Sequence, residues 1–383
     1  MSAARRTRIL IVDDSAVMRS LLRSIVHGDP ALEVAGTAAD GASALSLIET
    51  VRPDLLLLDV EMPVMDGLVT LRRLRARGQK MPVIMCSSLT QRGAKVTIEA
   101  LASGASDYVA KPAGQAGREA ASQALSQDLL PKIHAFTSQS QMEPPLSQPS
   151  QQPFPGPPRP PLILPMAPPH RPQAIVSTPV AVVIGVSTGG PAALDILLPA
   201  LPANFPLPVL IVQHMPELFT RLFAERLNGR CHLPVREAAD GDSVRPGAIY
   251  IAKGNWHMEV VPAARPGALH TLRLNQGPME NHCRPAVDVL FRSAAAAWGS
   301  GVLAVVLTGM GSDGLIGSRI VREHGGSVLA QDQPTSAVWG MPGAVTNAGL
   351  AHRVLPLGAI APEILRLACR PHIEARELRE SVV

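Results

Sequence analysis

A dense run of proline divides this sequence into two parts. Thirteen prolines lie between Pro144 and Pro172, mixed with Gln and Ser. Such a composition cannot bury enough apolar surface to build a packed core, so we expect a semi-extended tether over residues 131–178. The 383 residues leave room for one folded domain before the tether and another after it.

Short apolar runs alternate with helical patterns before the tether. The runs expected to form strands are residues 9–12, 32–35, 55–58, 82–86 and 107–110. This alternation is typical of a doubly wound parallel α/β domain, which we expect over residues 1–130.

Strand signals resume after the tether. Residues 180–184, 209–212 and 302–307 are apolar runs long enough for buried parallel strands. A second doubly wound parallel α/β domain is therefore expected over residues 179–370, and the charged residues 371–383 are expected to be a mobile tail. The predicted fold class is α/β in both halves.

Composition limits the classes of function. No apolar run is long enough to span a bilayer, so we expect no membrane insertion. The net charge is only +4 and aromatic residues are 3% of the chain, which disfavours nucleic acid as a partner. The four cysteines show no CxxC spacing, so neither a zinc site nor a disulfide framework is predicted, and a cytoplasmic location is expected.

Carboxylates gather at one predicted edge of the first domain. Asp13 and Asp14 end the first strand and Asp59 ends the third, and ligands of open α/β sheets bind at that edge. Carboxylates so close together are best joined by a hard cation such as Mg²⁺, while Lys111 adds a positive charge and Ser87 a hydroxyl. The set suits a carboxylate that accepts a phosphoryl group. Taken singly, each residue would be an ordinary cap, turn or surface charge.

The second domain carries a predicted nucleophile, base and orienting acid. Ser187 lies in a glycine-rich turn between a strand and a helix, His214 follows another strand, and Asp313 lies beyond the end of a third. All three would meet at one sheet edge, as acyl transfer by Ser, His and Asp requires. Singly, the serine could be a helix cap, the histidine structural and the aspartate a turn residue.

The first domain resembles a response-regulator receiver over residues 7–125, through Asp13-Asp14, residues 59–67, Ser87 and Lys111-Pro112. The resemblance implies a flavodoxin-like fold and a histidine kinase as phosphodonor. It also implies a role for each matching residue, with Asp59 as phosphoacceptor, Asp13, Asp14 and the Glu61 backbone carbonyl as Mg²⁺ ligands, Ser87 as phosphoryl contact and Tyr108 as the aromatic switch beside Lys111.

The second domain resembles the catalytic domain of chemotaxis protein-glutamate methylesterases, the CheB-type family. The matching segments are residues 185–190, 213–216, 284–291, 308–314 and 340–342, with Val186 and Ala286 as departures. The resemblance implies Ser187 as nucleophile, His214 as base and Asp313 as orienting acid, with Met310 and Thr188 beside the oxyanion site. It further implies a cytoplasmic monomer, without a cofactor for the ester chemistry, that demethylates helical receptor domains and deamidates selected glutamines.

Two other functions fit parts of the sequence. Another receiver-controlled serine hydrolase could use the G-x-S-x-G match at residues 185–189, but its chain order would require His324 or His352 as base. A response-regulator transcription factor would need a helix-turn-helix with a basic recognition helix, and residues 180–368 show no such pattern.

Overall fold

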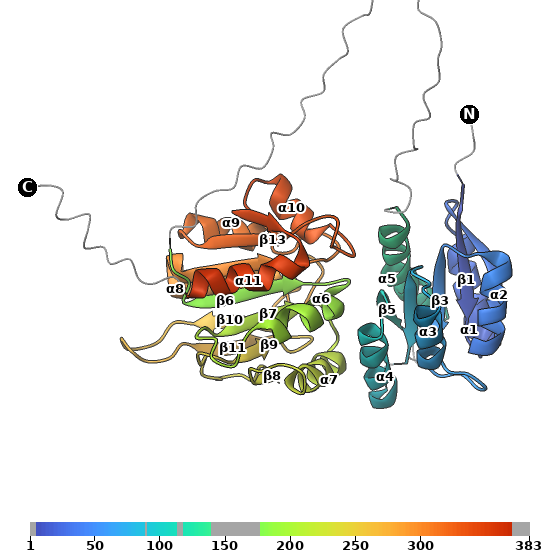
Figure 1. The fold of residues 1–383 in the computed structure, drawn as a ribbon, viewed down its shortest axis with the longest axis horizontal. Helices are drawn as coiled ribbons and strands as arrows, with labels where there is room; N and C mark the ends of the chain where they lie inside the picture. The colour runs from blue at the N-terminus through green and yellow to red at the C-terminus, as the bar shows by residue number, and fades with distance from the viewer. Residues whose placement is uncertain (1–4, 89, 113–117, 139–176, 370–383) are drawn as a thin grey trace, which may run out of the picture.

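The computed structural model describes residues 5–88, 90–112, 118–138 and 177–369, which form two α/β domains (Figure 1). Most of the predicted tether and the tail after residue 370 lie outside the described residues. Among those described, no helix combines the length and apolar character needed to cross a membrane.

The first domain alternates strands and helices throughout. Its parallel sheet has the strand order β2-β1-β3-β4-β5, the doubly wound arrangement expected from the sequence. In chain order the elements are β1 (Thr7–Val12), α1 (Ala16–His27), β2 (Leu32–Ala38), α2 (Gly41–Val51), β3 (Leu55–Asp59), α3 (Gly67–Ala76), β4 (Val83–Ser87), α4 (Gln91–Ala102), β5 (Asp107–Ala110) and α5 (Arg118–Ser138).

Helix α5 runs eight residues past the domain boundary expected at residue 130. Its later turns bury Ile133 and Phe136 in the same apolar cluster as Leu129 and the strand residue Ile9. Burial of these side chains stabilises the extra turns. The described part of this first domain, which we call the receiver after the resemblance noted above, therefore ends at Ser138.

The second domain is built on a seven-stranded parallel sheet in the order β14-β13-β12-β6-β7-β9-β8, with a separate antiparallel pair, β10-β11, that the sequence did not predict. The elements are β6 (Ala181–Val186), α6 (Gly190–Leu197), β7 (Val209–Gln213), α7 (Glu217–Asn228), β8 (Val235–Glu237), β9 (Ile249–Ile251), β10 (His257–Val261), β11 (Thr271–Asn275), α8 (Val287–Trp298), β12 (Val302–Val306), α9 (Leu315–Glu323), β13 (Ser327–Gln331), α10 (Met341–Asn347), β14 (Arg353–Leu355) and α11 (Leu357–Ala368).

The central strands of this sheet place its polar loops. Strands β12, β6 and β7 are neighbours, and every side chain in them is buried. Apart from Gln213 these strands are apolar, which suits a parallel sheet that is covered by helices on both faces. The loops after β12, β6 and β7 therefore open side by side at one sheet edge.

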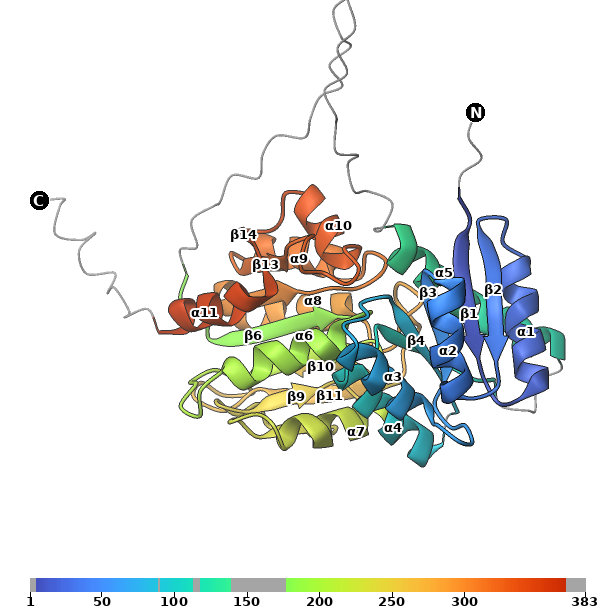
Figure 2. The same cartoon turned by 45° about the vertical axis from the view of Figure 1, so that its right-hand side comes forward.

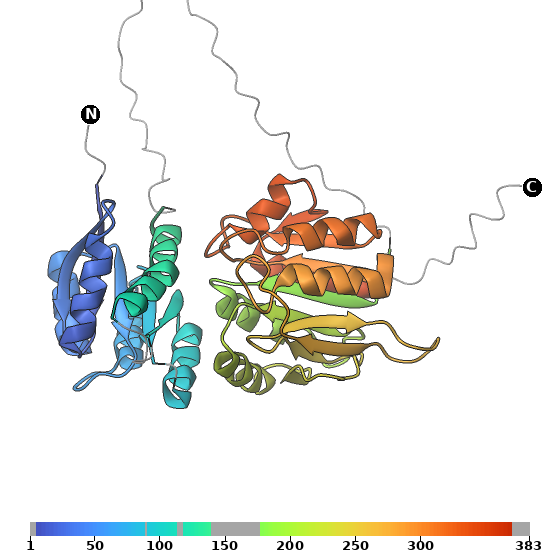
Figure 3. The same ribbon diagram turned by 180° about the vertical axis from the view of Figure 1, so that it is seen from behind.

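That edge faces the receiver. On the receiver side of the contact between the domains lie helices α4 and α5, and on the other side lie α6 and α7. This arrangement can be followed in Figures 1 and 2 and, from behind, in Figure 3. Tyr108 of β5 stacks on Phe219 of α7, with ring centroids 4.6 Å apart and ring planes 9° from parallel. No ion pair joins the two domains within the described ranges. Tyr108 and Phe219 belong to one buried apolar cluster with residues from both domains, so apolar packing is part of the contact.

Candidate active site

Ser187 occupies a tight turn between β6 and α6. Gly189 has φ 77°, a left-handed conformation that a side chain would strain. A Cβ at Gly189 would overlap Ala337, and one at Gly190 would overlap the Gln213 amide. The glycines therefore let the chain turn directly from a buried strand into a helix, and Ser187 is held at the sheet edge.

His214 and Asp313 form a hydrogen-bonded pair beside this turn. His214 directly follows β7, and its Nε2 lies 2.9 Å from Asp313 Oδ2. Asp313 lies in the loop between β12 and α9 and is only 2% exposed. The three strand-end residues predicted from the sequence are thus brought to neighbouring loops of one sheet.

Backbone amides at the start of α8 fix the Asp313 carboxylate. Oδ2 accepts a hydrogen bond from Val287 N–H at 2.7 Å, and Oδ1 accepts one from Asp288 N–H at 3.0 Å. The Asn281 amide donates to Oδ1 at 3.0 Å and to the Asp288 carboxylate at 2.9 Å. Asn281 gave no signal in the sequence, because it does not directly follow a strand.

The electrostatics of the pair favour a charged Asp313. Burial alone would raise the pKa of Asp313, but hydrogen bonds from His214 and the backbone amides outweigh it and hold the pKa below its usual value. Burial alone would lower the pKa of His214, yet Asp313 and Cys283 outweigh it and raise that pKa to about 9. Asp313 is therefore the acceptor for Nε2–H, and the proton that titrates near pH 9 is on Nδ1, which must lose it before His214 can act as a base.

Ser187 and His214 line a cavity of about 690 Å³ that both domains enclose. Catalytic-domain residues at its wall include Thr188, Met310 and Cys283. The receiver supplies the rest of the wall through β5 and α5, with Asp107, Tyr108, Ala124, Gln127, Asp128 and Lys132. The receiver therefore covers the pocket that holds the predicted nucleophile.

The Met310 amide is one of the free donors among the described residues that line this cavity. Within the described ranges it has no backbone or side-chain acceptor, whereas Ser187 N–H donates to Thr308 O at 3.0 Å. The Thr188 carbonyl accepts from Thr308 Oγ1 at 2.9 Å, which ties the serine turn to the loop after β12. Free amides in a pocket of this kind can stabilise a developing oxyanion.

The receiver edge holds the predicted acidic cluster. Carboxylate oxygens of Asp13, Asp14 and Asp59 lie within 4.8 Å of one another. Lys111 Nζ lies 2.8 Å from Asp13 Oδ2 and 2.7 Å from Asp59 Oδ1. Burial raises the pKa of Asp59 to about 6, Lys111 opposes this rise and Asp13 adds to it.

This cluster fits a divalent cation. Asp13 Oδ2 is buried, and Lys111 Nζ at 2.8 Å is its counter-charge. Asp14 is exposed, which leaves one side of the cluster open to water. An all-oxygen donor set that keeps some water suits Mg²⁺.

The other receiver residues predicted from the sequence lie around this edge or behind it. Ser87 is buried, and its hydroxyl accepts a hydrogen bond from Thr97 Oγ1 at 2.7 Å. The Glu61 side chain pairs with Arg92 at 3.2 Å, away from the acidic cluster. Tyr108 points instead into the contact between the domains, where it meets Phe219.

The histidines required by the alternative hydrolase lie elsewhere. His324 Nδ1 contacts the Ile320 carbonyl, and His352 Nδ1 accepts from Val328 N–H at 3.0 Å. Neither lines the cavity that contains Ser187.

Comparisons with known proteins identify the family of each domain. Residues 182–364 match the CheB methylesterase family and residues 9–122 the response regulator receiver domain. The chain is 50% identical to a protein-glutamate methylesterase/protein-glutamine glutaminase of Nocardioides sp., over 95% of this chain and 96% of that one. It is 46% identical to one of Trichodesmium erythraeum, over 94% and 98%. The catalytic domain of Thermotoga maritima CheB methylesterase shares 43% identity, covers 50% of this chain and 100% of its own, and has a TM-score of 0.48.

Proposed function

The chain belongs to the CheB-type family of receiver-controlled protein-glutamate methylesterases and protein-glutamine glutaminases that act in chemotaxis adaptation, and on that premise we propose that Ser187, His214 and Asp313 perform its hydrolysis. The observation that carries the assignment is the His214–Asp313 hydrogen bond of 2.9 Å at the wall of the cavity that Ser187 also lines.

The proposed reaction begins with proton transfer. Because the pKa of His214 is raised to about 9, the base is the minor neutral form of the ring, which accepts the Ser187 proton at Nδ1 while Ser187 Oγ attacks the carbonyl carbon of a glutamate methyl ester. Asp313 holds the ring through Nε2 and stabilises the imidazolium. The Met310 amide is the donor that we assign to the oxyanion, and Thr188 lines the approach.

Collapse of the tetrahedral intermediate breaks the bond to the methoxy group. The imidazolium returns its proton to that oxygen, methanol leaves, and an acyl-serine remains. A water molecule, deprotonated by His214, then attacks the acyl-serine. The bond to Ser187 Oγ breaks, His214 returns the proton to this oxygen, and glutamate is released. With a glutamine side chain as substrate, ammonia leaves in place of methanol.

A serine-directed fluorophosphonate probe tests this assignment. It should label the native enzyme, fail to label Ser187→Ala, and label His214→Ala far more slowly, because the base no longer activates the hydroxyl. His324→Ala is the matched control, since His324 is exposed and lies away from the cavity, and it should behave as the native enzyme. Equal labelling of His214→Ala and the native enzyme would remove His214 from the mechanism.

We assign phosphorylation of the receiver to Asp59, with a histidine kinase as donor. Mg²⁺ held by Asp13, Asp14, Asp59 and the Glu61 carbonyl would neutralise charge on the transferring phosphoryl group. Lys111 contacts Asp59 directly and would hold a phosphoryl oxygen, and Ser87 would hydrogen-bond another. Cytoplasmic location is part of the proposal, and the four free cysteines suit a reducing compartment.

The docked receiver should restrain the esterase, because it forms part of the wall around Ser187. A substrate helix on a receptor is about 10–12 Å across, so it reaches this serine only when the receiver moves aside. The stacked Tyr108 and Phe219 rings link the predicted switch residue to the domain contact. Phosphorylation at Asp59 would thus weaken docking through Tyr108.

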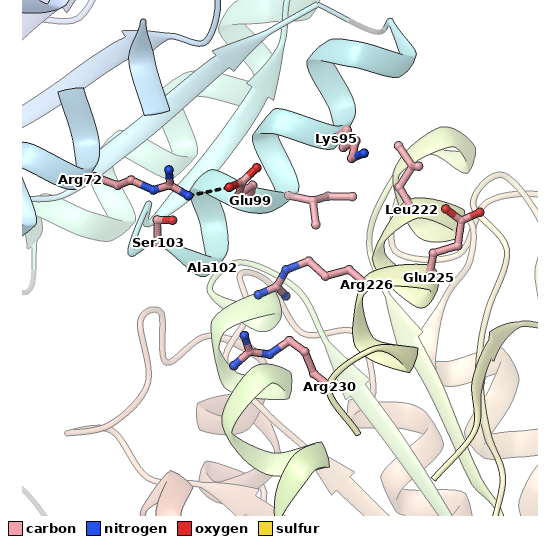
Figure 4. A pocket seen from close by; sticks show the side chains of 10 residues that line it. Arg72, Lys95, Glu99, Ala102, Ser103, Leu222, Glu225, Arg226 and Arg230 are labelled. Atoms are coloured by element: carbon pink, nitrogen blue, oxygen red, sulfur yellow. Dashed lines mark hydrogen bonds and ion pairs between the residues drawn. The ribbon is translucent and has the colours of Figure 1, made fainter. Parts of the chain in front are cut away.

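A second cavity shows that the rim of this contact is polar. About 500 Å³ lies between α4 and α7, and its lining includes the apolar residues Ile98 and Leu222. Figure 4 shows Leu222 among the charged side chains of this cavity. Its charged groups pair within their own domains, Arg72 with Glu99 on the receiver and Arg226 with Asp195 on the catalytic side. These charged groups therefore contribute little to the free energy that holds the two domains together. A weak contact of this kind suits an interface that must be released.

A further inference from the structure

Cys283 lies beside the proposed base, but ester hydrolysis makes no use of it. Its Sγ is 3.6 Å from His214 Nδ1, the ring nitrogen not bonded to Asp313. The thiol also lines the cavity that contains Ser187. One imidazole thus has a carboxylate on one nitrogen and a thiol on the other.

This spacing matches two corners of a tetrahedral zinc site. Zinc bonds of about 2.3 Å to sulfur and about 2.05 Å to nitrogen, at the tetrahedral angle, place the two ligand atoms about 3.6 Å apart. The observed separation has that value, so the thiol and the imidazole could bind one ion with little movement.

The surroundings of the pair also suit a metal. A histidine ligand usually donates its other N–H to a carboxylate, which fixes the ring and raises its basicity. Asp313 has that position, and α8 amides hold it in place. His214, Cys283 and Asp313 form one of two clusters in the described residues whose ligand atoms all lie within 4.8 Å of each other. The open cavity admits water as the remaining ligands.

We propose that Cys283 and His214 form an inhibitory Zn²⁺ site in the esterase pocket. The inhibition, though not the metal binding, rests on the proposed role of His214. Zinc binds the thiolate and takes the Nδ1 lone pair, so the thiol proton is released, together with the Nδ1 proton where the ring carries one. His214 can then no longer accept the Ser187 proton, and no electron transfer is involved.

Cobalt(II) is a suitable probe for the metal site, because it accepts the same ligands and a thiolate ligand gives it a charge-transfer absorption in the near ultraviolet. The full-length chain, stripped of metal and kept in excess Mg²⁺ to occupy the acidic cluster, should show this band at about one ion per chain. Cys231→Ser, which changes a thiol far from the pocket, should keep the band, whereas Cys283→Ser should lose it. A band that persists in Cys283→Ser, or its absence from the native chain, would overturn the site.

Inhibition is measured separately, as methanol release at buffered free Zn²⁺, with each protein compared to its own metal-free rate. The native chain and Cys231→Ser should be inhibited at the same concentration. Cys283→Ser should need at least about tenfold more zinc, and equal sensitivity would refute inhibition through Cys283. A Cys283-dependent cobalt band without any inhibition would instead overturn His214 as the base, which separates the two proposals.

Discussion

Replacing Tyr108 by leucine should raise the activity of the unphosphorylated enzyme. The substitution removes the ring that stacks on Phe219, with centroids 4.6 Å apart, and keeps an apolar side chain at the interface. Stacked aromatic pairs contribute about 0.5–1.5 kcal/mol beyond their buried area. Since about 1.4 kcal/mol corresponds to a factor of ten, the undocked and active population should rise by about twofold to tenfold.

The assay is methanol release from methylated receptor membranes without a phosphodonor. Val17→Ala is the matched control, because Val17 is an exposed apolar residue of the receiver on α1, and its rate should stay at the native value. The rate of a fragment that begins at Thr178 sets the upper limit for Tyr108→Leu. If Tyr108→Leu releases methanol at the native rate while the fragment that begins at Thr178 is faster, the stacking does not hold the domains together.

Three further outcomes are expected. The fragment that begins at Thr178 should hydrolyse receptor esters faster than the unphosphorylated full chain, and matched rates in the same methanol assay would exclude restraint by the receiver. Asp59→Ala should abolish Mg²⁺-dependent phosphorylation and leave basal ester hydrolysis intact; base-labile phosphate still incorporated by this variant would identify another acceptor. Asp313→Asn should fold normally yet lose up to about 10⁴-fold in kcat, as comparable triad changes do. The control Asp332→Asn, in a neighbouring loop, should keep the native kcat. A loss below about threefold in Asp313→Asn would exclude Asp313 as the orienting residue.

Sequence alone located the strand-end residues because parallel sheets impose a simple rule. Side chains that follow apolar runs emerge at one edge, so Ser187 and His214 could be placed together without coordinates. The acidic cluster of the receiver followed from the same rule. Both α/β folds and the family were confirmed.

Other features depend on tertiary packing and left no local signal. Asn281 and Cys283 reach the site from the loop before α8, which follows no strand of the central sheet. Cys283 and His214 are 69 residues apart in the sequence, and only the fold brings the thiol and the imidazole together. The end of α5 at Ser138 also depends on side chains buried by the sheet.

The contact between the domains was equally hidden in the sequence. Tyr108 reads as an ordinary strand aromatic, and Phe219 as part of an amphipathic helix. Their stacking requires two separately folded surfaces to meet, which periodicity along the chain does not encode.

Methanol release by Ser187→Ala tests the central assignment most directly. The variant and the native chain are given the same methylated receptor membranes, and phosphate incorporation is followed in parallel to show that the receiver remains folded and active. We predict that Ser187→Ala releases no methanol above the enzyme-free rate while its receiver is phosphorylated as in the native chain. Appreciable methanol release by this variant would contradict Ser187 as the nucleophile.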